Sequence, residues 1–179
     1  GEEVKNIAKL FKNPTIYLRK ESTEEKIKSL KLQDYQYIPL ATHVYLNLKK
    51  PALSSIIFTL DDDPTEDGFL LTKEIFNLTI NADLVVLSAC YTGLGKHITG
   101  EGLVGLTQAW YYAGASALMV SLWSVDANST NHLMKNFYQG IKNLKTHSQA
   151  LRQAKIELLK QKSYAHPYYW AGIILQGGQ

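Results

Sequence analysis

Two side chains in this sequence combine nucleophilic and basic chemistry, and each follows an apolar run. Cys90, the only cysteine in 179 residues, comes shortly after the run 84–87, and His43 ends the run 35–42. A free thiol has a pKa near ~8.5, so a neighbouring imidazole is needed to make it an effective nucleophile at neutral pH. A lone cysteine or histidine at a strand end is more often a structural residue. Residue type alone therefore leaves both roles open.

The runs that precede these two residues are typical of strands in an α/β sheet. Residues 84–87, Leu-Val-Val-Leu, form a continuous apolar run, as expected of a strand buried on both faces. Further strands are expected at 15–18, 54–60, 69–71, 117–123 and 169–175. Helices are expected at 4–11, after the hydroxyl cap 22–23, from 72, and at 102–112, 129–141 and 148–162.

This alternation predicts a three-layer α/β fold with a mainly parallel sheet and helices on both faces. Functional groups gather at the carboxyl ends of parallel strands, so we expect His43 and Cys90 to meet there. Residues 1–179 are expected to form one domain. Because the chain starts at Gly1 and enters a helical pattern at once, we interpret it as excised from a longer protein that includes an upstream region.

Composition narrows the classes of partner. The chain has 19 Lys and Arg against 16 Asp and Glu, a dispersed excess that argues against nucleic-acid binding. The longest apolar stretch, 113–123, is shorter than the ~20 residues that cross a bilayer. One cysteine excludes an intrachain disulfide and a cysteine-rich zinc site. We therefore expect a soluble, cytoplasmic domain without membrane contact.

Other local signals carry less weight. The loop 93–96, Gly-Leu-Gly-Lys, lacks the remaining residues of a Walker phosphate loop, although a small phosphorylated ligand there stays a weak alternative. His97 in the same loop is a rival base for Cys90. The acids 61–63, with Glu66 and Asp67, are interpreted as a solvated turn in preference to a calcium site. No metal and no cofactor are expected.

Seven fragments in order resemble the CHAT domain, a caspase-like and separase-like family of cysteine peptidases often found with tetratricopeptide repeats. Two of them carry the candidate residues: 37–43, Tyr-Ile-Pro-Leu-Ala-Thr-His, and 83–95, which includes Leu-Ser-Ala-Cys and the glycine-rich loop. The other five are Asp-Gly-Phe-Leu-Leu-Thr at 67–72, Gly-Glu-Gly-Leu at 100–103, Ala-Gly-Ala at 113–115, Ser-Leu-Trp-Ser-Val-Asp at 121–126 and Tyr-Trp-Ala-Gly at 169–172.

The resemblance implies a caspase-like fold and a cysteine endopeptidase that acts on a protein or peptide substrate. In that reading Cys90 is the nucleophile, His43 protonates the leaving amine, and the backbone N–H groups of Cys90 and Val44 hold the oxyanion. Ser88 matches a position that lines the first specificity pocket. It also implies a larger, bacterial parent protein, regulated by a tetratricopeptide-repeat region or a partner.

The same resemblance assigns Trp123 and Asp126 to the other wall of the substrate groove. The next residue, Ala127, stands where related peptidases often have an aspartate that meets a basic substrate residue. We therefore expect little preference for Arg or Lys before the cut and a tilt toward uncharged residues.

Two departures from the family pattern support an alternative. Val44 stands where Gly is usual, and a β-branched residue resists the positive φ that Gly allows. Tyr91 stands where an acidic residue is common. The alternative is a catalytically impaired caspase-like scaffold for protein–protein interaction.

Overall fold

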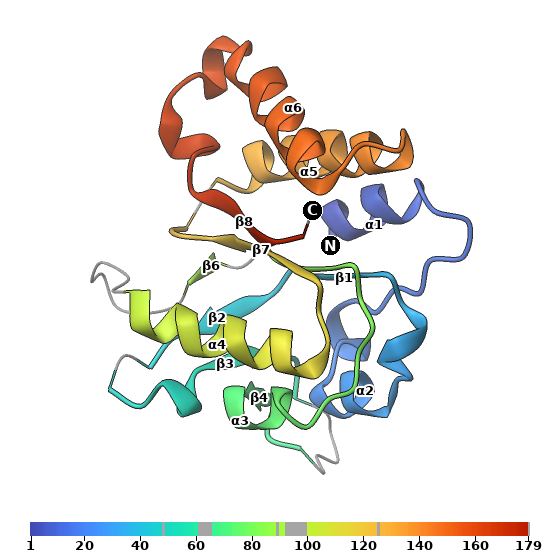
Figure 1. Cartoon of the computed structure of the whole chain (residues 1–179), viewed down its shortest axis with the longest axis vertical. Coiled ribbons are helices and arrows are strands. Elements are labelled where there is room, and N and C mark those ends of the chain that lie inside the picture. The colour runs from blue at the N-terminus through green and yellow to red at the C-terminus, as the bar shows by residue number, and fades with distance from the viewer. Residues whose placement is uncertain (48, 61–65, 89, 92–99, 125, 179) are drawn as a thin grey trace.

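A twisted sheet lies between two layers of helices in the computed structural model (Figure 1). The structure describes residues 1–47, 49–60, 66–88, 90, 91, 100–124 and 126–178, and it describes residues 90, 91 and 100–102 by their backbone. This arrangement is the predicted three-layer α/β architecture with a mainly parallel sheet, and it agrees with a caspase-like fold.

The strands form two hydrogen-bonded groups. The first group has the order β1 (Tyr37–Leu40), β5 (Leu84–Leu87), β7 (Ala117–Ser121), β8 (Ile173–Gly177). The first three are parallel and β8 is antiparallel to β7. The second group has the order β4 (Phe69–Leu71), β3 (Ser55–Ile57), β2 (His43–Tyr45), β6 (Cys90–Tyr91). Since β2 follows β1 and β6 follows β5, the central parallel pair extends from one group into the other.

Alternate residues of the central strands supply two hydrophobic cores, one on each face. Val85 and Leu87 pack into the core beneath α4, while Leu84 and Val86 pack into the core beneath α5 and α6. All four side chains of β5 are buried, which confirms the prediction of a strand covered on both faces. In Figure 1, α4 covers one side of the sheet and α1, α5 and α6 the other.

The helices have the following bounds: α1 Glu2–Ala8, α2 Glu24–Ser29, α3 Thr72–Ile75, α4 Gly100–Ala113, α5 Ala127–Lys142 and α6 His147–Leu159. Short 3₁₀ helices lie at Arg19–Glu21, Leu32–Asp34, Pro51–Leu53, Lys162–Tyr164 and Pro167–Tyr169. The predicted cap of α2 is confirmed: the Thr23 hydroxyl accepts the N–H of Lys26 at 3.1 Å. No helix in the described part of the chain is long and apolar enough to cross a membrane.

Several expected strands differ from the observed ones: those expected at 54–60 and 117–123 are shorter, at Ser55–Ile57 and Ala117–Ser121. The prediction of a strand at 15–18 is wrong, because this stretch makes no ladder with a neighbouring strand in the described chain. Its β-branched and aromatic residues favour extended backbone, but a strand also needs a partner edge. The run 35–42 gives only β1, and His43 starts β2 after a two-residue break. The last strand begins at Ile173, not at residue 169.

Candidate functional site

His43 and Cys90 lie opposite each other on adjacent parallel strands. They are Cα partners in the register of β2 and β6, and the next pair is Val44 with Tyr91. Neighbouring strands are ~4.8 Å apart, so the two backbones lie within reach of a side-chain contact. The two positions are 47 residues apart in the chain, and the parallel pairing that begins in β1 and β5 brings them into this register.

The entry into β2 is held by its neighbour on the other side. The Thr42 hydroxyl donates to the backbone C=O of Ile57, and His43 is the Cα partner of Ile57 in the antiparallel pair β2–β3. The His43 side chain is exposed, and it lies at one end of a groove of about 1150 Å³. The pairing with β3 and the break before β2 therefore fix the backbone position of His43.

Val44 occupies a different environment from the one expected. It is 1% exposed, lies inside β2 between β3 and β6, and has no positive φ. The positive φ that Gly would allow is therefore not adopted at this position, and a strand is where β-branched residues fit.

Ser88, the expected pocket residue, contacts a carboxylate that the sequence did not reveal. Its hydroxyl donates to Oε1 of Glu3 at 2.8 Å, and Glu3 comes from α1, 85 residues earlier. Burial raises the pKa of the Glu3 carboxyl above its ordinary value, by more than the bond from Ser88 lowers it. No local pattern signals this contact, because it depends on how α1 packs over the end of β5.

Trp123 and Asp126 follow β7, and both make contacts within the protein. The Trp123 indole N–H donates to the backbone C=O of Tyr168 at 3.0 Å. Its ring lies so close to Gly172 that a Cβ there would fall 2.5 Å from Cε2. The Asp126 carboxylate accepts the N–H of Ser129 at 2.8 Å and caps α5. Asp126 is thus already bonded as a helix cap.

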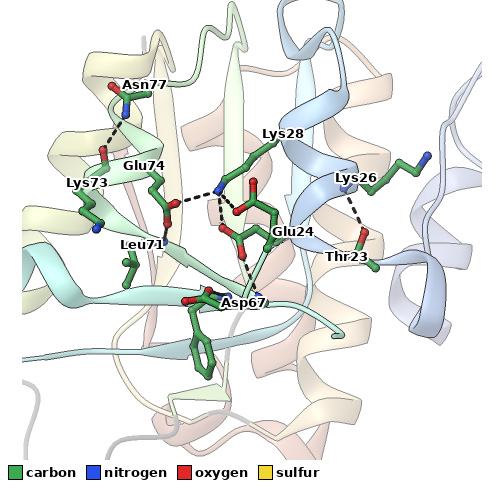
Figure 2. Close-up of polar contacts among 12 residues, drawn as sticks. Thr23, Glu24, Lys26, Lys28, Asp67, Leu71, Lys73, Glu74 and Asn77 are labelled. Atoms are coloured by element: carbon green, nitrogen blue, oxygen red, sulfur yellow. Dashed lines mark hydrogen bonds and ion pairs between the residues drawn. The ribbon is translucent and has the colours of Figure 1, made fainter. Parts of the chain in front are cut away.

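Several residues weighed from the sequence lie outside the described residues. These are His97, the loop 93–96 and the acids 61–63. Among the described residues, one acidic group could in principle hold a cation: ligand atoms of Glu24, Glu66 and Glu74 lie within 4.8 Å of one another. Figure 2 shows that Lys28 points into this group from α2.

The Lys28 ammonium fills the position that a metal would take. Its Nζ lies 2.7 Å from Glu24, 2.8 Å from Glu66 and 2.9 Å from Glu74. One part of this cluster had a signal in the sequence, because Glu24 and Lys28 have the i, i+4 spacing of helical ion pairs. With an ammonium bonded to all three carboxylates, this group is a structural ion-pair cluster.

Comparison with known proteins identifies the family of this chain. The chain is 32% identical over 117 residues to tetratricopeptide repeat protein 28 from Mus musculus and, over the same length, to that from Homo sapiens. These alignments cover 65% of this chain but only 5% of either relative. Both relatives are named for tetratricopeptide repeats, as the resemblance leads one to expect. The CHAT domain family profile matches residues 1–178, so the chain belongs to the CHAT domain family of caspase-like, cysteine peptidase-related proteins.

Proposed function

We propose that this domain is a cysteine endopeptidase whose His43 and Cys90 form the catalytic dyad. The observation that carries the proposal is the β2–β6 register, in which these two residues are Cα partners within a CHAT domain. Nucleophile activation requires a thiol close to an imidazole, and the pairing of the two backbones on adjacent strands supports that requirement. The exposure of His43 and its place at the end of a groove also support access by a polypeptide.

The proposed reaction proceeds in two steps. The Cys90 thiolate attacks the scissile carbonyl carbon, and the protonated imidazole of His43 gives its proton to the leaving amine nitrogen as the C–N bond breaks. His43, now neutral, takes a proton from water as the water oxygen attacks the thioester carbon; the C–S bond breaks, and the acid product leaves with the Cys90 thiolate and protonated His43 restored. We assign the oxyanion to backbone N–H groups at Cys90 and Val44, where each well-placed donor lowers the barrier by about 3 kcal/mol.

For the residue before the cut, we propose an uncharged side chain next to Ser88, with Trp123 on the other wall. Asp126 caps α5, and Ala127 offers no carboxylate. Among the described residues, Glu3 is the acid bonded to Ser88, and burial raises the pKa of its carboxyl. A substrate-library profile led by arginine would contradict this assignment, and its loss in Glu3→Gln would identify Glu3 as the missing carboxylate.

The proposal includes control by other parts of a larger protein. The chain spans about a twentieth of its curated relatives, and they are named for tetratricopeptide repeats. We therefore propose that a tetratricopeptide-repeat region of the parent chain, or a separate regulatory partner, governs access to the dyad. The bacterial origin and the cytoplasmic location also stay predictions.

One observation favours the scaffold as a second candidate. Val44 lies buried inside β2, whereas an oxyanion donor must face the substrate. Active-site labelling separates the two functions. A peptidyl acyloxymethyl ketone should modify Cys90 at least a hundredfold faster than free cysteine if the thiol is activated, with the adduct located by mass spectrometry. Labelling no faster than free cysteine, with His43→Ala making no difference, would leave only the scaffold.

A further inference from the structure

The loop that follows β7 is bonded to the segment that precedes β8. The Trp123 indole N–H donates to the backbone C=O of Tyr168 at 3.0 Å. In return, the Tyr168 hydroxyl donates to the backbone C=O of Ser124 at 2.7 Å. These bonds join positions 45 and 44 residues apart, and each uses a side chain of one segment and the main chain of the other. We call this reciprocal pair of bonds the Trp123–Tyr168 clamp.

Two further contacts hold the ends of the same loop. At one end the N–H of Leu122 donates to the C=O of Gly172 at 2.7 Å, and at the other the Asp126 carboxylate caps α5. Loop residues that contact a ligand need such support from the rigid parts of a fold. The loop between β7 and α5 is therefore bonded at both ends and at Trp123, which fixes where the indole lies.

The packing of the indole explains why residue 172 is a glycine. Gly172 does not adopt positive φ, so its backbone does not itself require glycine. A Cβ at this position would lie 2.5 Å from Cε2 and 2.8 Å from Cδ2 of Trp123, closer than a Cβ atom can approach. The indole therefore packs against the main chain of Gly172, while Trp123 as a whole stays partly exposed.

The clamp lies at the end of the sheet that carries the candidate dyad. Val120 is the Cα partner of Leu87 in the parallel pair β5–β7. Trp123 and Cys90 each come three residues after these partners, so both follow the carboxyl ends of neighbouring strands. Tyr168 is 46% exposed. Two aromatic side chains that are open to solvent are thus held at the end of the sheet where the proposed nucleophile lies.

We infer that Tyr168 is a positioning residue for substrate binding, which holds Trp123 beside the dyad so that the indole contacts an apolar side chain of the substrate. Aromatic rings offer a large apolar area, and a fixed orientation lowers the entropy lost on binding. This inference rests on the endopeptidase function proposed above. It implies that good substrates carry an apolar residue within a few positions of the cut.

The binding test uses the Cys90→Ala chain, so that cleavage does not interfere. Fluorescent hexapeptides that carry leucine or aspartate at one position at a time are titrated and followed by anisotropy. At one position we expect leucine to bind about tenfold more tightly than aspartate. Tyr168→Phe keeps the ring but removes the bond to Ser124, and it should weaken binding of the leucine peptide about fivefold.

The matched control is Tyr164→Phe, which removes a hydroxyl from a tyrosine in the preceding 3₁₀ helix. The Tyr164 ring packs on His132 and Tyr169, outside the clamp. This control should change the affinity less than about twofold. Equal losses in both variants, or a loss in neither, would overturn the role of Tyr168.

A second variant acts on Trp123 from its other contact. Gly172→Ala places a methyl group where the indole now lies, so the ring must move. A folded Gly172→Ala chain, identified by circular dichroism, should bind the leucine peptide about tenfold more weakly. Unchanged binding by that chain would overturn the contact of Trp123 with the substrate. Where Gly172→Ala does not fold, Tyr168→Phe decides the question.

Steady-state kinetics separates positioning from a merely structural role. With Cys90 intact and the leucine peptide as substrate, Tyr168→Phe should raise KM about fivefold and leave kcat within about twofold, because a binding contact is weakened and the dyad is kept. Alkylation of Cys90 by iodoacetamide, which is too small to need the indole, should keep its rate. A lower kcat with unchanged KM would overturn positioning of the substrate contact.

These measurements also separate this inference from the function on which it rests. A leucine preference that depends on Tyr168, without cleavage by the unmodified chain, would leave the substrate contact and contradict the endopeptidase. Cleavage that is insensitive to Tyr168→Phe would leave the endopeptidase and overturn the inference. A chain that neither prefers leucine at any position nor cleaves would overturn both.

Discussion

Two lysines of α2, only two residues apart, lie in opposite electrostatic environments. Lys28 bonds to three carboxylates at 2.7–2.9 Å, whereas Lys26 is exposed at the groove and forms no ion pair within the described chain. Two positions on an α-helix differ by ~200°, which places them on opposite sides. In Figure 2, Lys26 extends away from the carboxylates that surround Lys28.

The paired charge joins parts of the structure that are distant in sequence. Through Lys28, α2 is bonded to Glu66 before β4 and to Glu74 of α3. Glu24, 1% exposed, also accepts the N–H of Gly68, which holds a turn with φ of +79°. The comparison teaches that a lysine paired with carboxylates joins distant elements, while an exposed lysine on the same helix takes no part in holding them together.

The largest expected effect concerns the two residues of the proposed dyad. His43→Ala and Cys90→Ala should each reduce kcat/KM for a peptide substrate by about 10⁴-fold or more, because each removes a reacting group. The two losses should not add, since the groups act as one unit. Thermal melts should match the parent chain within about 2 °C. Substantial turnover by Cys90→Ala would contradict its role as the nucleophile.

Removing the paired charge of Lys28 should lower the stability of the fold. Lys28→Met leaves Glu24 buried without a cation, so the free energy of unfolding should fall by about 3 kcal/mol. Urea titration followed by circular dichroism measures this loss, and Lys26→Met serves as the control with a change below about 0.5 kcal/mol. Similar losses for both lysines would remove the distinction between the two charges.

A substitution at Val44 tests whether this residue, next to the proposed dyad, acts through packing in the core or through catalysis. Val44→Gly removes a buried side chain from β2 and adds backbone freedom, so we expect a loss of about 2 kcal/mol. Because Val44 has no positive φ, Gly relieves no strain there, and the rate constant of the chemical step should not increase. Single-turnover kinetics measures this rate constant. An increase would show that the backbone at Val44 departs from this strand conformation when the enzyme reacts.

Salt should affect the exposed charge of Lys26 and the paired charge of Lys28 differently. When ionic strength is raised from 0.05 to 0.5 M, exposed charges such as that of Lys26 are screened within a few ångströms. The stability difference between the parent chain and Lys28→Met should change by less than about 0.5 kcal/mol, because the buried pair is screened less. A larger loss at high salt would show that Lys28 and its carboxylates behave as solvated surface charges.

The smallest expected effect is at alkaline pH. Burial lowers the pKa of Lys28, but hydrogen bonds to Glu24, Glu66 and Glu74 raise it by more, to above its ordinary value of 10.5. Its stabilising contribution is therefore complete below pH 10.5 and declines as the pH rises toward the folded-state value. The parent chain should lose its advantage over Lys28→Met in that range, as measured by urea titration. A constant difference through pH 12 would contradict the ion pairing.

Local sequence determined the elements that depend on nearby residues. The apolar run 84–87 gave a strand buried on both faces, and Thr23 capped α2 as expected. The family assignment also came from sequence, because its fragments keep their order along the chain. These features hold because side-chain periodicity and capping act over a few residues.

The tertiary structure decided what depends on distant partners. The stretch 15–18 has the composition of a strand, yet it stays unpaired because no strand edge meets it. The contact of Glu3 with Ser88 and the meeting of Glu66 and Glu74 at Lys28 join residues 38 to 85 positions apart. Likewise, Val44 adopts ordinary strand backbone because β3 and β6 pair on its two sides. Such pairings follow from the packing of whole elements, and no local pattern encodes them.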